Sequence, residues 1–188
     1  MSIEYSQATA SFHIKSRDTS YVIGIEAGKH PSSRYWGAAL REWRSPPSSV
    51  SVERPFTPCP DPAAPLLSLD TLPREYPAFG NSDFRAPAFQ VLQEDGSTIV
   101  DLAFKGHRIL AGKPGLEGLP STYVEREPEA ETLELTLLDE LIGLEVTLSY
   151  SAFASYDAIA RSARLRNLGP RPLRLMRALS ASVDLPRS

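Results

Sequence analysis

The 188-residue chain is poor in the residues that build most redox and metal sites. It has one cysteine, Cys59, so an intramolecular disulfide is excluded, and a reducing compartment fits this usage. Cys59 stands between two prolines with no histidine near it in the sequence, which argues against a catalytic thiol. The three histidines, His13, His30 and His107, have no metal-ligand spacing. We therefore expect no metal and no cofactor.

Long apolar runs and an excess of one charge are missing as well. No segment approaches the length of a membrane-spanning helix, and residues Met1 to Tyr5 lack the basic and apolar regions of a signal peptide. The net charge of -3 gives no electrostatic attraction to nucleic acid or to an anionic membrane. The sequence predicts a cytoplasmic protein that binds neither nucleic acid nor membrane.

Basic residues nevertheless gather near the end of the chain. They alternate with apolar residues at the spacing of a strand, and no aromatic stacking platform accompanies them. We interpret them as one solvated face of a sheet, and a nucleic-acid patch is the less favoured alternative. The residues are Arg161, Arg164, Arg166, Arg171, Arg174 and Arg177.

Most of what is present in the sequence has the period of β-strands. Residues 11–15 and 21–26 are separated by turn residues and predict an early hairpin. Residues 132–137 and 144–150 alternate strictly between leucine or valine and polar residues, which predicts an antiparallel hairpin with one buried face. No amphipathic helix of ordinary length is visible. The pattern predicts an all-β protein, an antiparallel β-sandwich.

Two further segments carry more specific expectations. An Asp-Gly turn at Asp95 joins residues 89–93 to residues 98–102, and this predicts a second hairpin. Nine prolines fall between Ser45 and Pro77, which excludes a regular strand or helix there. The large apolar residues of the same stretch favour an extended segment held against a surface, with a flexible linker as the alternative.

The acidic and aromatic residues suggest binding more than catalysis. Hydrolysis of a glycosidic bond with retention needs two carboxylates about 5–5.5 Å apart, and no spacing in this chain fixes such a pair. We interpret Asp83, beside Arg85, as part of a structural ion pair. Tyr35, Trp36 and Trp43 lie among charged residues, which suits a sugar, whose C–H faces pack on aromatic rings; a packing or subunit contact is the equal alternative.

Several ordered motifs resemble one known family over essentially the whole chain. They include Tyr35-Trp36-Gly37, the segment Arg54 to Pro58, Gly80 to Ala88, Gly118 to Glu125 and Arg177 to Asp184. The stretch from Arg74 to Phe89, with three prolines and four aromatic residues, matches almost residue for residue. The chain resembles the amino-terminal domain of the family 36 glycoside hydrolases, the retaining α-galactosidases.

The resemblance implies a particular architecture and activity. Family members have a large amino-terminal sandwich of the galactose-mutarotase-like supersandwich type, then a catalytic (β/α)8 barrel and a small β domain. It implies that residues 1–188 are an incomplete sandwich that lacks the barrel, and therefore contain no catalytic residue. The intact enzyme would hydrolyse terminal α-linked galactose, as in melibiose or raffinose, with retention and without a metal.

The resemblance also implies a subunit arrangement and a candidate site. Family members form oligomers, often tetramers, in which a loop of one sandwich reaches the active site of a neighbour. Glu53, Arg54 and Phe56 match that loop and are the expected substrate-binding residues. Relatives tend to carry aspartate at position 53 and asparagine at position 59. An ion pair of Glu53 with an arginine is the competing interpretation, and a free-standing carbohydrate-binding or interaction module is the alternative function for the chain.

Overall fold

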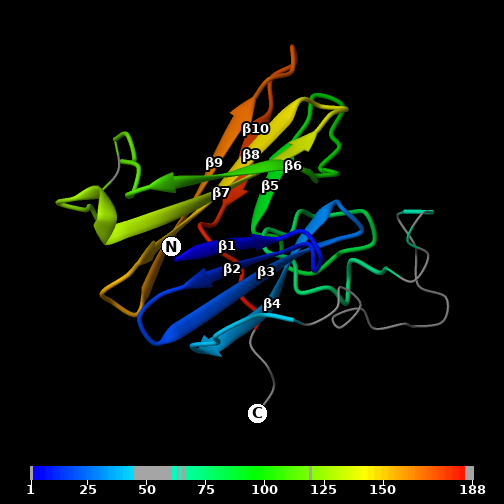
Figure 1. Ribbon diagram of the computed structural model, residues 1–188. Helices are drawn as coiled ribbons and strands as arrows, with labels where there is room; N and C mark the ends of the chain where they lie inside the picture. Colours follow the sequence, from blue (N-terminus) through cyan, green and yellow to red (C-terminus); the bar gives the residue numbers. More distant parts are fainter. Residues whose placement is uncertain (1, 45–60, 63, 65–66, 119, 185–188) are drawn as a thin grey trace.

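The computed structural model describes residues 2–44, 61–62, 64, 67–118 and 120–184. These residues form two four-stranded sheets and one two-stranded pair, and all the strand pairs are antiparallel. Figure 1 shows the amino-terminal sheet in blue and cyan beside the second large sheet in green to orange. The predicted all-β antiparallel fold is confirmed.

The amino-terminal sheet has its strands in sequence order. These are β1 (Ile3–Ser6), β2 (Ser11–Lys15), β3 (Thr19–Glu26) and β4 (His30–Ala38). In the predicted first hairpin, Ile14 lies opposite Tyr21 and Phe12 lies opposite Ile23. The β-branched and aromatic residues of β3 suit this position, since the strand is buried along nearly its whole length.

The second large sheet also follows sequence order. Its strands are β6 (Ala103–Ala111), β7 (Ala130–Asp139), β8 (Leu144–Phe153) and β9 (Ala158–Asn167). The β7–β8 hairpin has the predicted register, with Leu135 opposite Leu148 and Leu137 opposite Val146. A short 3-10 helix, η2 (Glu127–Glu129), precedes β7, and the described part of the chain contains no helix long and apolar enough to cross a membrane.

The hairpin predicted around Asp95 is wrong. The turn itself forms, because Gln93 donates its backbone N–H to Ser97 at 2.9 Å. β5 (Phe89–Leu92), however, pairs with β10 (Arg174–Ala178), and residues 98–102 form no strand. Side chains accept hydrogen bonds from the backbone of this segment instead: the N–H of Asp101 donates to Asp139 Oδ2 at 2.8 Å. The strand that pairs with β5 is therefore β10, which is distant in the sequence, and not the segment that follows the turn.

The core lies between the two large sheets. One contiguous cluster of buried residues takes Phe12, Ile14 and Ile23 from the first sheet and Leu135 and Leu148 from the second. Each of these residues is 0% exposed. Complete burial of such a side chain contributes about 1.5–3 kcal/mol, so the two alternating patterns account for much of the stability of the sandwich.

The described end of the proline-rich segment is held against this sandwich, as predicted. Leu67, Leu69 and Leu72 are buried together. Pro73 accepts a hydrogen bond from the backbone of Ser33 at 2.8 Å, which ties the segment to the outer edge of β4. The rest of the prediction, for residues 45–60, lies outside the described residues.

The turn between β7 and β8 depends on a glycine. Gly143 has φ +68°, a conformation that costs an L-residue about 1–2 kcal/mol. A Cβ at this position would also lie 2.5 Å from the backbone nitrogen of Gly169, in the turn that follows β9. Two neighbouring turns therefore approach each other at a distance that only glycine permits.

We predict that Gly143→Ala lowers the free energy of unfolding by more than about 2 kcal/mol, since strain and backbone clash add. The matched control is Gly96→Ala, where φ is +84° and nothing lies within 4 Å of the new Cβ. That variant should lose only the conformational cost. Urea titration of both variants measures the difference, and equal losses would contradict the close approach of the two turns.

Candidate functional site

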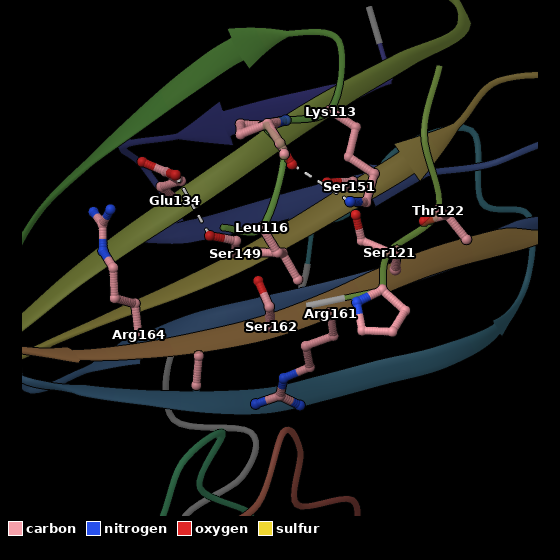
Figure 2. A pocket seen from close by; sticks show the side chains of 15 residues that line it. Lys113, Leu116, Ser121, Thr122, Glu134, Ser149, Ser151, Arg161, Ser162 and Arg164 are labelled. Atoms are coloured by element: carbon pink, nitrogen blue, oxygen red, sulfur yellow. Dashed lines mark hydrogen bonds between the residues drawn. The ribbon is translucent and has the colours of Figure 1, made fainter. Parts of the chain in front are cut away.

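Polar groups line several hollows on the sandwich, and two of these are candidate sites. The first is a groove of about 230 Å³ between the loop that follows β6 and the outer face of the second large sheet. Figure 2 shows Lys113, Leu116, Ser121 and Thr122 on the loop side and the sheet residues beneath them. The labelled sheet residues are Glu134, Ser149, Ser151, Arg161, Ser162 and Arg164.

The strand alternation that buries the core gives this groove its polarity. Leu133 and Leu135 point into the core, so Glu134 between them points to the outer face. Glu134 accepts a hydrogen bond from Arg108 Nε at 2.5 Å, and the hydroxyl of Ser149 lies 3.5 Å from its other oxygen. Glu134 is the one carboxylate among the described residues that line the groove. The groove can hold a polar ligand, but it does not supply the pair of carboxylates that glycoside hydrolysis requires.

The second hollow has a volume of about 360 Å³ and lies beside Trp36. β3 and β4 contribute Tyr21 and Trp36, and β8 and β9 contribute Tyr150 and Arg161. Asp157, in the turn between β8 and β9, is the one carboxylate in its described lining. We refer to this space as the Trp36 hollow.

A buried carboxylate joins the elements around the Trp36 hollow. The side chain of Glu75 is 0% exposed. Tyr21 donates its hydroxyl to Glu75 Oε1 at 2.5 Å, and Tyr150 donates to Oε2 at 2.6 Å. Arg161 Nη2 lies 3.1 Å from Oε2 and supplies the compensating charge. One carboxylate of the proline-rich segment therefore contacts both large sheets.

The same cluster fixes the protonation of its two phenols. Burial, with the nearby carboxylate of Glu75 as the next cause, raises the pKa of both Tyr21 and Tyr150. Both hydroxyls therefore stay protonated at neutral pH and remain hydrogen-bond donors. Arg161 also lies over the ring of Tyr150, with its guanidinium carbon 4.9 Å from the ring centroid.

Arg161 contradicts the interpretation of the carboxyl-terminal arginines as one solvated face. Its neighbours Arg164 and Arg166 are exposed, as predicted. Arg161 is in phase with the core residues of β9, and its side chain is 12% exposed. Figure 2 shows its guanidinium on the opposite side of β9 from Ser162. The shared phase of Arg161 with Ala163 and Leu165 was the sequence signal that could have revealed this.

Asp83, the carboxylate that the sequence assigns to a structural ion pair, has two arginine partners. Asp83 is buried and pairs with Arg85 Nε at 2.9 Å, as predicted, and with Arg74 Nη1 at 3.5 Å. Arg85 also donates to the carbonyl oxygens of Leu69 and Leu72. These bonds hold the segment from Leu67 to Arg85 in place, which is a structural role for both residues.

The predicted substrate-binding residues belong to the part of the sequence between Trp43 and Asp61. Glu53, Arg54 and Phe56 lie outside the described residues. On either side of them the chain is anchored: Trp43 packs on Tyr35 with ring centroids 6.1 Å apart, and Asp61 pairs with Lys29 at 3.2 Å.

The three aromatic residues near the front do not form one cluster. Tyr35 and Trp43 pack together, whereas Trp36 contacts Tyr21 edge to face with ring centroids 6.2 Å apart. The reason is the alternation of β4, which sends Tyr35 and Trp36 to opposite faces. Trp36 lines a hollow together with Tyr21 and Tyr150.

The histidines are separate from one another in the fold. His13 Nε2 and the hydroxyl of Ser20 are 2.8 Å apart, and His107 packs on Phe12 with centroids 4.7 Å apart. His30 is 3% exposed. Within the described ranges, no group of three or more residues able to bind a metal gathers in space.

The fold is that of a β-sandwich domain. The described linings of its two candidate hollows suit ligand binding, and the sandwich itself suits a supporting role in a larger protein. Comparison with known families then identifies it: residues 29–188 match the model of the glycosyl hydrolase family 36 N-terminal domain. The chain belongs to this family.

Individual relatives agree with this assignment. The chain is 52% identical over 186 residues to the α-galactosidase AgaA of Geobacillus stearothermophilus, covering 99% of this chain and 26% of that protein. It is 34% identical over 183 residues to α-galactosidase 1 of Pediococcus pentosaceus, covering 97% of this chain and 25% of that protein. The chain therefore spans about a quarter of the length of these relatives.

Solved structures match the fold closely. The crystal structure of the family 36 α-galactosidase AgaB from Geobacillus stearothermophilus superposes with a TM-score of 0.92 at 51% identity, covering 99% of this chain and 25% of that one. A variant of AgaA solved in complex with raffinose gives a TM-score of 0.88 at 53% identity, covering 94% of this chain and 24% of that one. The resemblance inferred from the sequence motifs is confirmed.

We predict that Glu75→Gln lowers the free energy of unfolding by about 3–5 kcal/mol, because it leaves the charge of Arg161 buried without its partner. The matched control is Tyr21→Phe, which removes one hydrogen bond to a charged group and should cost less, about 1.5–3 kcal/mol. Chemical denaturation with far-UV circular dichroism measures both. A Glu75→Gln variant as stable as Tyr21→Phe would show that the ion pair contributes nothing.

Acid should destabilise the fold through His30. Burial, with Arg74 and Lys29 as further causes, lowers the pKa of His30 from 6.5 to about 4. Since the folded pKa lies below the unfolded one, the unfolded state binds more protons between pH 6.5 and pH 4. Stability is therefore fully present above pH 6.5 and falls with acidification, by about 2 kcal/mol at pH 5 from this residue.

His30→Leu should remove that part of the pH dependence, because leucine cannot take a proton. His107→Gln is the control, since His107 is exposed and its substitution should leave most of the slope intact. The measurement is the urea midpoint of each variant at pH 7 and pH 5. An unchanged slope in His30→Leu would mean that another group causes the acid sensitivity.

Proposed function

We propose that this chain is the amino-terminal sandwich portion of an α-galactosidase that hydrolyses terminal α-linked galactose from oligosaccharides with retention. The observation that carries the proposal is the match to α-galactosidases over 99% of this chain at 52% identity. Relatives of the same fold were solved with raffinose and with stachyose. Both are α-galactosides, which supports the same substrate class here.

The catalytic carboxylates belong, in this proposal, to a barrel outside residues 1–188, and the sandwich is completed by further strands. The described lining of each of the two candidate hollows offers one carboxylate, which is fewer than glycoside hydrolysis needs. Exposed apolar side chains near the carboxyl-terminal end would be covered in the complete protein. They are Leu168, Leu175, Met176 and Leu179.

The sandwich also supports oligomerisation, with a tetramer as the expected state, and Glu53, Arg54 and Phe56 contact substrate in a neighbouring subunit. Anchors on both sides of this segment support an arm fixed at its two ends: Trp43 on Tyr35 and Asp61 on Lys29. Fixed ends reduce the conformational entropy that an arm loses when it docks. The cytoplasm is the proposed location of the whole enzyme, and the single cysteine fits such a reducing compartment.

A chimaera tests these statements. The chain replaces the matched quarter of AgaA, and the fusion should hydrolyse a chromogenic α-galactoside, whereas the isolated chain should not. In the active fusion, Glu53→Ala should lower kcat/KM for raffinose about tenfold to a hundredfold, the range for losing a hydrogen bond to a charged group.

The control is Glu117→Gln, an exposed carboxylate of another loop, which should leave kcat/KM unchanged. Sedimentation velocity on each fusion separates loss of assembly from loss of a contact. Turnover by the isolated chain would refute the proposed division of labour. Unaltered kcat/KM in a tetrameric Glu53→Ala fusion would refute the substrate contact.

A further inference from the structure

The Trp36 hollow combines an exposed aromatic platform with polar groups in one space. Its volume of about 360 Å³ lies at the lower end of the range of about 300–1,000 Å³ typical of small-molecule sites.

Trp36 is the platform. Its side chain is 58% exposed, which is unusual for a residue of this size on a strand. Tyr21 contacts it edge to face, with an interplanar angle of 88°, and thereby restricts the plane of the indole. Tyr21 is itself fixed by its hydrogen bond to Glu75. The indole is consequently held in place while more than half of it remains open to solvent.

Arg161 brings an unused donor to the same hollow. Its Nη2 donates to the carbonyl oxygen of Glu75 and pairs with the Glu75 carboxylate. Its Nη1 makes one long hydrogen bond, 3.5 Å to the carbonyl oxygen of Ser182, and therefore has a further N–H to offer to a ligand.

Asp157 supplies acceptors at the rim. Its Oδ1 accepts hydrogen bonds from the backbone N–H of Asp18 at 2.6 Å and from Ser16 Oγ at 3.3 Å. These bonds orient the carboxylate from the turn between β8 and β9. A carboxylate can accept about four hydrogen bonds, so capacity remains for a ligand hydroxyl.

We propose that the Trp36 hollow binds a pyranose unit of a neutral oligosaccharide, separately from any catalytic centre. The partly positive C–H groups on one face of the sugar pack on the negative face of the Trp36 indole. Hydroxyls on different carbons of the ring donate to Asp157 and accept from Arg161, because a pyranose carries both donors and acceptors around its ring. The net charge of Glu75, Arg161 and Asp157 is small, which suits a neutral ligand.

The test uses the isolated chain and raffinose. The chain has two tryptophans, so Trp43→Phe leaves Trp36 as the single indole reporter. Trp43 packs on Tyr35 outside the hollow, and this variant is therefore the matched control that should bind like the wild type. Raffinose should change the fluorescence of Trp36 saturably, with a Kd of about 1 mM, and calorimetry should give the same value.

Trp36→Ala should weaken the calorimetric Kd at least about tenfold. Asp157→Asn keeps an acceptor for the backbone of Asp18 but lacks the charge, and it should weaken Kd about threefold to tenfold. Circular dichroism and urea midpoints confirm that both variants are folded, and the Asp157 variant keeps the proposal testable if Trp36→Ala is unstable.

The proposal is overturned by any of three results. Raffinose produces no saturable signal up to about 10 mM, or folded Trp36→Ala binds as tightly as the wild type, or sedimentation shows that a second copy of the chain covers Trp36 irrespective of sugar. Binding by the isolated chain is independent of catalysis in the chimaera. Failure of one proposal therefore leaves the other standing.

Discussion

The arrangement of this domain depends on the burial of a single carboxylate, Glu75. A charge removed from water must be compensated, and here two phenols and one guanidinium provide the compensation. Tyr21 comes from the first large sheet, and Tyr150 and Arg161 come from the second. Because these partners are spread over both layers, the carboxylate fixes the path of the proline-rich segment and the relative placement of the sheets at the same time.

This constraint also explains why the Trp36 hollow has its particular composition. Glu75 orients Tyr21, Tyr21 restricts Trp36, and the ion pair with Glu75 holds Arg161 in the lining of the hollow. A second polar surface, the groove of Figure 2, has a simpler origin. It follows from strand alternation, which directs the hydroxyl-bearing side chains of β7 to β9 away from the core.

Local patterns predicted the elements well and their partners less reliably. The period of two placed β2, β3, β7 and β8, since each strand lies beside its neighbour in sequence. The Asp95 turn was misleading because a strong turn signal does not specify what β5 pairs with. Its partner β10 is contributed by residues more than eighty positions away. The motifs, by contrast, predicted the family directly, because so many ordered matches do not arise by chance.

The sequence by itself determined the all-β class, the inner and outer faces of β7 and β8, and the family. These properties depend on local periodicity and on residue identity, which a linear reading contains. Only the tertiary structure decided that Arg161 is buried, that Trp36 and Trp43 separate, and that Glu75 lies at the centre of the interior. The physical reason is that compensation of a buried charge is a long-range requirement: its partners, Tyr21 and Tyr150, are separated from Glu75 by 54 and 75 positions.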